Sequence, residues 1–236
     1  MTTIPDGVQA VLFDLDGTLL DTVADLHAAI NGMLADVGCP LLPEDTVCRY
    51  VGRGVTNLVR RSLWGAAAEE SGTASTDKDA SLLAVALDRF RCHYAVENGR
   101  RAVLYPGVRD GLEAIRGRAL PMWVLTNKAS EFTRPLLEMT GLMSFFSVVV
   151  SGDDLPWHKP SPLPLVWACG RLGVSPANTL FVGDSVNDFL AARAAGCPVA
   201  LLPYGYNEGR DVRELDENAI VPSILAVAER LRTHLT

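Results

Sequence analysis

The strongest constraint on the fold of this chain is a series of short, near-continuous apolar runs. Runs of this kind, rich in branched and aromatic residues, are typical of strands buried on both faces of a parallel sheet. Four of them organise most of the sequence, and a fifth lies near its end: residues 10–13, 122–125, 146–150, 180–182 and 199–202. Amphipathic helical patterns lie between the later runs, and each of those helices is expected to end at a glycine. Strands alternating with helices predict an α/β fold with a doubly wound, Rossmann-like parallel sheet.

This alternation is interrupted between residues 21 and 102, where the pattern is helical only. Apolar residues there mostly repeat every three or four positions, which is typical of helices with one buried face. We therefore predict a small all-helical domain at residues 21–102, inserted into an α/β core made of residues 1–20 and 103–236.

The first helix of the insert carries recognisable end signals. Thr22 and Asp25 have the spacing of a capping box, and Gly38 stands where a helix C-terminus favours glycine. The sequence predicts that this helix begins at Thr22 and ends at Gly38.

Polar side chains follow the ends of the predicted strands. In open α/β sheets, ligands bind beyond the carboxyl ends of the strands, so these side chains are expected to meet at one edge. Four separate segments contribute them: Asp14, Asp16 and Thr18; Thr126 and Asn127; Lys159; Asp184 and Asp188.

The carboxylates of this group indicate a metal site. Asp14 and Asp16 are two residues apart, so on an extended chain their side chains point the same way. Together with Asp184 and Asp188 they would repel one another strongly unless a cation joined them or one kept a proton. A hard divalent cation with oxygen ligands fits this set, and Mg²⁺ is the usual choice beside a phosphate.

The remaining polar residues suit a phosphate ester. Thr18 and Thr126 are expected to donate hydrogen bonds to phosphoryl oxygens, and Lys159 supplies a positive charge. A carboxylate such as Asp14 can act as a nucleophile and form an acyl phosphate that water later removes. Asp16 could then protonate the leaving group and deprotonate the water. Asn127 and Lys128 are assigned mainly to helix capping and solvent.

Four motifs resemble those of the haloacid dehalogenase superfamily, in the same order: DLDGTLLDT at 14–22, LTNK at 125–128, KP at 159–160 and VGDSVND at 182–188. The resemblance implies a phosphatase with Asp14 as nucleophile and Asp16 as general acid and base. It also implies that Asp14, the Asp16 carbonyl and Asp184 hold Mg²⁺, that Thr126 and Lys159 bind phosphate, and that the helical insert is a cap closing over the site.

A narrower resemblance is to bacterial phosphoglycolate phosphatases, carried by residues 50–54, 184–198 and 204–207. It implies hydrolysis of 2-phosphoglycolate to glycolate. Arg53 departs from the residue expected there, and an arginine could clamp a carboxylate, a second phosphate or a sugar acid. A phosphatase or phosphomutase acting on a sugar phosphate or a nucleotide therefore stays open as the alternative.

Charge and composition limit the partners. The net charge is −7 and basic residues occur in pairs at most, so a nucleic-acid partner is not expected. No apolar run approaches the roughly 20 residues that cross a bilayer.

The five cysteines lack a CxxC pair, which together with a start unlike a secretion signal indicates a reduced, cytoplasmic protein. A small phosphate ester is the expected partner, and the sequence leaves open whether the protein is a monomer or a dimer.

Overall fold

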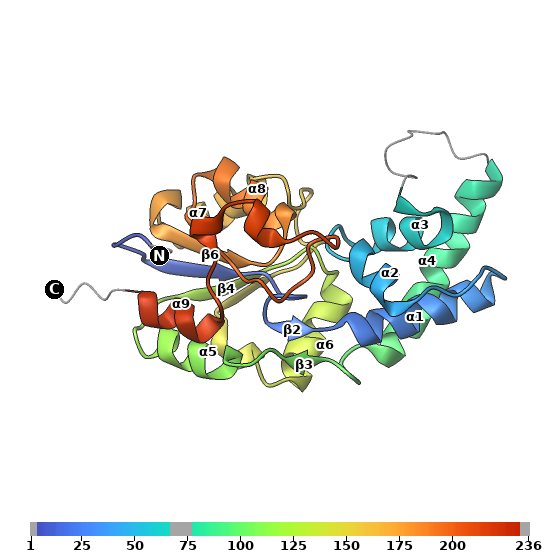
Figure 1. Cartoon of the computed structure of the whole chain (residues 1–236), viewed down its shortest axis with the longest axis horizontal. Helices are drawn as coiled ribbons and strands as arrows, with labels where there is room; N and C mark the ends of the chain where they lie inside the picture. Colours follow the sequence, from blue (N-terminus) through green and yellow to red (C-terminus); the bar gives the residue numbers. More distant parts are fainter. Residues whose placement is uncertain (1–3, 67–76, 232–236) are drawn as a thin grey trace.

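A five-stranded parallel sheet forms the centre of the larger part of the molecule (Figure 1). The computed structural model describes residues 4–66 and 77–231. The strands run in the order β5-β4-β1-β6-β7, and every neighbouring pair is parallel. Their bounds are Ala10–Phe13 (β1), Met122–Leu125 (β4), Val148–Val150 (β5), Thr179–Gly183 (β6) and Val199–Leu201 (β7). All five predicted strands are confirmed, with ends that differ from the predicted ones by two residues at most.

Helices cover both faces of this sheet. On one face they are α5 (Val108–Arg116), α6 (Ser130–Met139) and α9 (Ile224–Arg230), and on the other α7 (Leu163–Leu172) and α8 (Val186–Ala195). Within β1, Val11 and Phe13 pack toward the first group while Leu12 packs toward the second, as the two-residue period of a strand requires. The doubly wound α/β fold is confirmed. Short 3₁₀ turns complete this part of the chain: Met143–Phe145, Pro176–Asn178, Val212–Glu214 and Glu217–Ala219.

The insert has its own apolar core. Its helices are α1 (Val23–Asp36), α2 (Glu44–Tyr50), α3 (Val55–Trp64) and α4 (Asp77–Glu97). They bury Ile30, Met33 and Phe90 among themselves, and Phe132 and Tyr206 of the α/β part join the same cluster. The helical insert is therefore confirmed, and it packs against the edge of the sheet that carries the predicted site (Figure 1).

Two short strands lie where the chain enters and leaves the insert. β2 (Leu20–Asp21) pairs antiparallel with β3 (Val103–Leu104). This pair straddles the predicted boundaries at 20/21 and 102/103, and the division into domains at those residues stays a prediction. None of the helices in the described parts of the chain is both long and apolar enough to span a bilayer.

The predicted capping box at the start of α1 is wrong. Thr22 is the N-cap residue, but its hydroxyl donates to Asp16 Oδ1 at 2.8 Å instead of capping the helix. The buried carboxylate of Asp25 accepts hydrogen bonds from the backbone N–H groups of Gly99, Arg101 and Ala102, at 2.8, 2.8 and 3.2 Å. Both side chains have partners from outside the helix, and these replace the local bonds. The end of α1 follows the prediction, because Gly38 adopts a left-handed φ of 71° just beyond it.

Asp25 therefore ties the start of the insert to the segment that leaves it. We expect Asp25→Ala to lower the free energy of unfolding by about 2–4 kcal/mol, because three backbone N–H groups lose their acceptor. Asp36→Ala, at the exposed end of the same helix, is the matched control and should cost less than about 1 kcal/mol. Urea unfolding of both variants measures the difference, and equal midpoints would contradict this role for Asp25.

Candidate active site

The predicted polar residues meet at the carboxyl ends of the strands. Asp14 follows β1, Thr126 follows β4, Asp184 follows β6, and Lys159 comes from the loop after β5. The Lys159 ammonium lies 2.9 Å from Asp14 Oδ1 and 2.7 Å from Asp188 Oδ1. The convergence of four chain segments expected from the sequence is confirmed.

Three carboxylates form an acidic cluster at this point. Asp14, Asp184 and Asp188 each offer an oxygen, and these atoms lie within 4.8 Å of one another. Burial raises the pKa of Asp14 to about 6; Lys159 opposes this shift and Asp188 adds to it. Burial also raises the pKa of Asp184, with further contributions from Asp188 and Asp14. A donor set of carboxylate oxygens whose charges repel one another fits a hard divalent cation.

Lys159 offsets part of this negative charge. Burial lowers its pKa, but the carboxylates of Asp14 and Asp188 outweigh that effect and raise it overall. Its backbone is held by Asn127, whose Oδ1 accepts from the Lys159 N–H at 3.0 Å and whose Nδ2 donates to the Lys159 carbonyl at 2.9 Å. Asn127 Nδ2 also donates to the Gly52 carbonyl at 2.9 Å, which links this support to the insert.

Asp188 serves the helix and the cluster together. One of its oxygens accepts from the N–H and the hydroxyl of Ser185, which completes a capping box at the start of α8. The other oxygen receives the Lys159 ammonium. Asp188 therefore caps α8 and contacts the Lys159 ammonium at the same time.

Asp184 is tightly enclosed. Thr18 donates its hydroxyl to Asp184 Oδ1 at 2.6 Å, and the Tyr206 N–H donates to Asp184 Oδ2. A Cβ atom on either Gly17 or Gly205 would lie 2.3 Å from Asp184 Oδ2, so both positions need glycine. The Thr18 hydroxyl supports Asp184 in this arrangement, and its donation to phosphate stays a prediction.

Asp16 faces a different partner from the one expected. Its carboxylate is not part of the acidic cluster but lies 3.2 and 3.3 Å from Lys128 Nζ. Lys128 is buried and also donates to the hydroxyl of Tyr94 on α4. The assignment of Lys128 to solvent is wrong. A lysine three residues beyond the end of β4, in a chain with only Lys78, Lys128 and Lys159, was the available indication that it belongs to the site.

A small cavity of about 50 Å³, the inner cavity, lies between the insert and the sheet. Asp14, Asp16, Thr126, Asn127 and Lys128 line it from the α/β part, and Leu26, Val51, Gly52, Gly54, Val55, Leu58 and Tyr94 from the insert. The carboxylates of Asp14 and Asp16 thus reach one space, as their spacing predicted. Thr126 does not cap α6, whose N-cap residue is Ala129, and its hydroxyl accepts from the Lys128 N–H at 3.3 Å.

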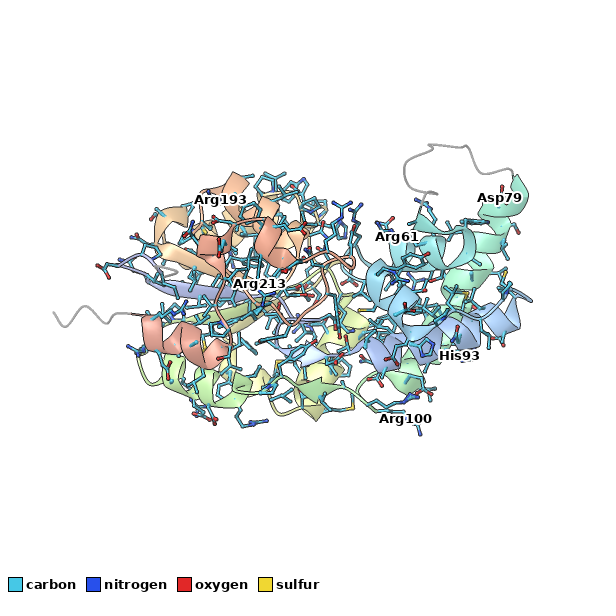
Figure 2. The ribbon with its side chains drawn as sticks, viewed as in Figure 1. Arg61, Asp79, His93, Arg100, Arg193 and Arg213 are labelled. Carbon is cyan, nitrogen blue, oxygen red and sulfur yellow. The ribbon has the colours of Figure 1, made fainter. Side chains whose placement is uncertain are left out.

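Arg53 lies outside the lining of this cavity. Its Nε is 2.7 Å from Glu208 Oε1, and Arg61, which Figure 2 labels on the insert, is 3.5 Å from the same oxygen. Arg53 instead lines an open cleft of about 660 Å³ next to the inner cavity, together with residues such as Trp157 and His158. The pairing with Glu208 joins the insert to the loop that follows β7.

The same loop reaches the start of the insert. The hydroxyl of Tyr206 accepts from the N–H groups of Thr22 and Val23, at 2.7 and 3.0 Å, and donates to Asp21. Because the Tyr206 N–H also holds Asp184, one residue contacts both the acidic cluster and the first turn of α1.

A family model described as haloacid dehalogenase-like hydrolase matches residues 11–202. The chain belongs to this family. Among its relatives, a phosphoglycolate phosphatase of Thiobacillus denitrificans is 45% identical over 97% of both chains. One of Nitrosospira multiformis is 47% identical over 93% of this chain and 94% of the other.

Two solved structures share the fold of this chain. The crystal structure of a predicted phosphoglycolate phosphatase from Haemophilus somnus superposes with a TM-score of 0.86 at 32% identity, covering 94% of this chain and 97% of the other. A β-phosphoglucomutase-like structure from Thermotoga maritima has a TM-score of 0.71 at 23% identity, covering 95% and 100%, and shows the shared fold alone.

The raised pKa of Asp14 generates a prediction for metal binding. Without metal, folded Asp14 keeps its proton up to about pH 6, whereas the unfolded carboxyl loses it near pH 3.8. This group therefore stabilises the metal-free protein at low pH, and that contribution is lost as the pH rises toward 6. A divalent cation needs the deprotonated form, so the rise in Tm on adding MgCl₂ should be larger at pH 7.5 than at pH 5.

Thermal unfolding in EDTA and in MgCl₂ at pH 5, 6 and 7.5 measures this difference. Asp14→Asn is the comparison variant: it removes one of the two carboxyl groups with a raised pKa and one expected ligand, so the gain in Tm should be smaller at each pH. An equal or larger gain at pH 5 would show that the cation does not bind to this cluster.

Proposed function

We propose that this protein is a magnesium-dependent phosphatase that hydrolyses 2-phosphoglycolate to glycolate and phosphate through an aspartyl-phosphate on Asp14. The observation that carries the proposal is the buried contact of Asp14 with Lys159 inside a cluster of carboxylates, at the mouth of a small cavity. Family membership and relatives named phosphoglycolate phosphatase at 45–47% identity over nearly the whole chain support it.

Asp14 acts as the nucleophile, and Asp16 acts as the general acid and base. A carboxylate oxygen of Asp14 attacks the phosphorus, the bond to the ester oxygen breaks, and Asp16 gives a proton to the departing alkoxide. Water then attacks the phosphorus of the acyl phosphate while Asp16 takes its proton, which releases phosphate and restores Asp14. Both side chains line the inner cavity, which is consistent with contact to one bound ester.

Lys159 and Thr126 are assigned to the phosphoryl group. The ammonium of Lys159 already touches Asp14 and would neutralise an equatorial oxygen beside it, while Thr126 donates its hydroxyl. Asp14, Asp184 and the Asp16 carbonyl would hold Mg²⁺, with Asp188 in support. The ion, when bound, supplies positive charge for the phosphoryl oxygens.

The size of the inner cavity favours a small substrate. About 50 Å³ accommodates a short organic group, whereas sites for drug-sized ligands usually span about 300–1,000 Å³. Within the inner cavity a two-carbon acid fits better than a nucleotide, whose larger groups would have to lie in the neighbouring open cleft. Arg53 stays a candidate for substrate selection from the neighbouring cleft.

We also propose that the protein acts in the cytoplasm. The five cysteines are all free thiols, and the nearest buried pair, Cys169 and Cys197, keeps its sulfurs 3.9 Å apart. Thiols of this kind suit a reducing compartment.

The substrate is tested by a panel of small phosphate esters, sugar phosphates and nucleotides, assayed with and without Mg²⁺. We expect 2-phosphoglycolate to give the highest kcat/KM, and EDTA to abolish its turnover. A sugar phosphate with higher efficiency would reassign the substrate, and full activity in EDTA would refute the metal.

The role of Asp14 is tested by Asp14→Asn. An amide cannot form the acyl phosphate, so kcat should fall by at least about a thousandfold. Circular dichroism and Tm should show an intact fold, and Asp36→Asn, far from the site, should keep normal turnover. A near-normal rate in purified Asp14→Asn would rule out the nucleophile.

A further inference from the structure

The inner cavity contains one basic side chain among its described lining residues, that of Lys128. Lys128 is only 6% exposed, which is unusual because a lysine is rarely buried unless it is paired. Its Nζ lies where the sheet edge and α4 meet, 4.5 Å from the centre of the Tyr94 ring and in contact with the Tyr94 hydroxyl. The ammonium is therefore positioned on the side of the cavity that the insert closes.

The other buried lysine, Lys159, is already paired with carboxylates of the acidic cluster. Lys159 lies between Asp14 and Asp188, where it offsets the charge of the acidic cluster, and it does not line the inner cavity. An ester with a second negative charge on its organic part needs a further cation inside the cavity, since burying an unpaired charge is costly. Among the residues that line the cavity, Lys128 alone can supply it.

The contacts of Lys128 leave room for such a ligand. Both distances to Asp16, 3.2 and 3.3 Å, involve the two oxygens of a single carboxylate, which also accepts from Thr22 at 2.8 Å. An ammonium has three N–H donors. The two Asp16 oxygens can share one of these donors and the Tyr94 hydroxyl takes a second, so the third can reach a ligand in the cavity that Lys128 lines.

Arg53 is less well placed for this task. Its guanidinium pairs with Glu208 at 2.7 Å and lines the open cleft, where water screens charge more strongly than in a small buried space.

We propose that Lys128 is the residue that determines specificity for the organic part of the ester, by binding its carboxylate. The site would then select short phosphorylated carboxylic acids over uncharged esters of the same length. This inference rests on the proposed function, because it assumes that the ester binds with its phosphoryl group at Asp14.

The experiment separates this role from simple positioning of Asp16. The kcat and KM of wild type, Lys128→Gln, Lys128→Met and Lys128→Arg are measured for 2-phosphoglycolate and for 2-hydroxyethyl phosphate, which lacks the carboxylate. Loss of the contact to Asp16 affects both esters alike, so it cancels in the ratio of their kcat/KM values. Loss of a carboxylate contact affects only the first ester.

We expect the ratio to fall by at least about 30-fold in Lys128→Gln and Lys128→Met, mainly through KM, and to be partly retained in Lys128→Arg. Tyr94→Phe is the matched control, because it removes one contact of Nζ but keeps the charge; its ratio should stay within about threefold of wild type. A folded variant without the positive charge that keeps the full preference would overturn the proposal.

Failure of the proposed function and failure of the inference about Lys128 give different results. Wild-type protein that hydrolyses phosphate esters but not 2-phosphoglycolate would overturn the proposed function and this inference together. A strong wild-type preference that survives in the Lys128 variants and disappears in Arg53→Gln would overturn the inference alone and assign the carboxylate to Arg53.

Discussion

The ammonium of Lys159 between Asp14 and Asp188 is the interaction on which the rest of the site depends. Three carboxylates this close repel one another in a buried environment; burial raises the pKa of both Asp14 and Asp184, and the neighbouring carboxylates raise it further. A buried ammonium relieves part of it, provided that its own position is fixed. Asn127 does this through two hydrogen bonds to the backbone of Lys159. The strands β1, β4 and β6 and the loop after β5 must therefore assemble together, because each supplies one member of the group.

Much of the fold could be predicted because its elements depend on local pattern. A strand buried on both faces must be apolar at nearly every position, so runs such as 10–13 and 122–125 are visible in the sequence. Polar residues directly after such runs must lie at the carboxyl edge of the sheet. This places Asp14, which directly follows β1, at that edge; Lys159, 145 positions later in the numbering, was expected there because its loop follows the run at 146–150.

The contacts that local pattern did not reveal are made outside the helix or strand to which each residue belongs. Thr22 and Asp25 have the spacing of a capping box, but their partners are Asp16 and the backbone near Gly99. Thr18 donates to a carboxylate 166 positions away. Lys128 is buried only because α4 of the insert brings Tyr94 over it. No local pattern encodes these contacts, since they arise from how separate elements pack: Thr18 meets Asp184 within the α/β part, and Lys128 meets Tyr94 of the insert.

The short loop after β7 makes several of the contacts that hold the insert on the α/β part. Tyr206 holds Asp184 with its backbone and the first turn of α1 with its hydroxyl, and Glu208 pairs with Arg53 and Arg61 of the insert. Related enzymes with different substrates are commonly viewed as a constant core that carries exchangeable caps. In this chain a foreign cap would need a first turn matched to Tyr206 and a basic surface matched to Glu208. Transplanting a cap between homologues thus requires moving the loop after β7 with it, and the two regions are constrained to diverge together.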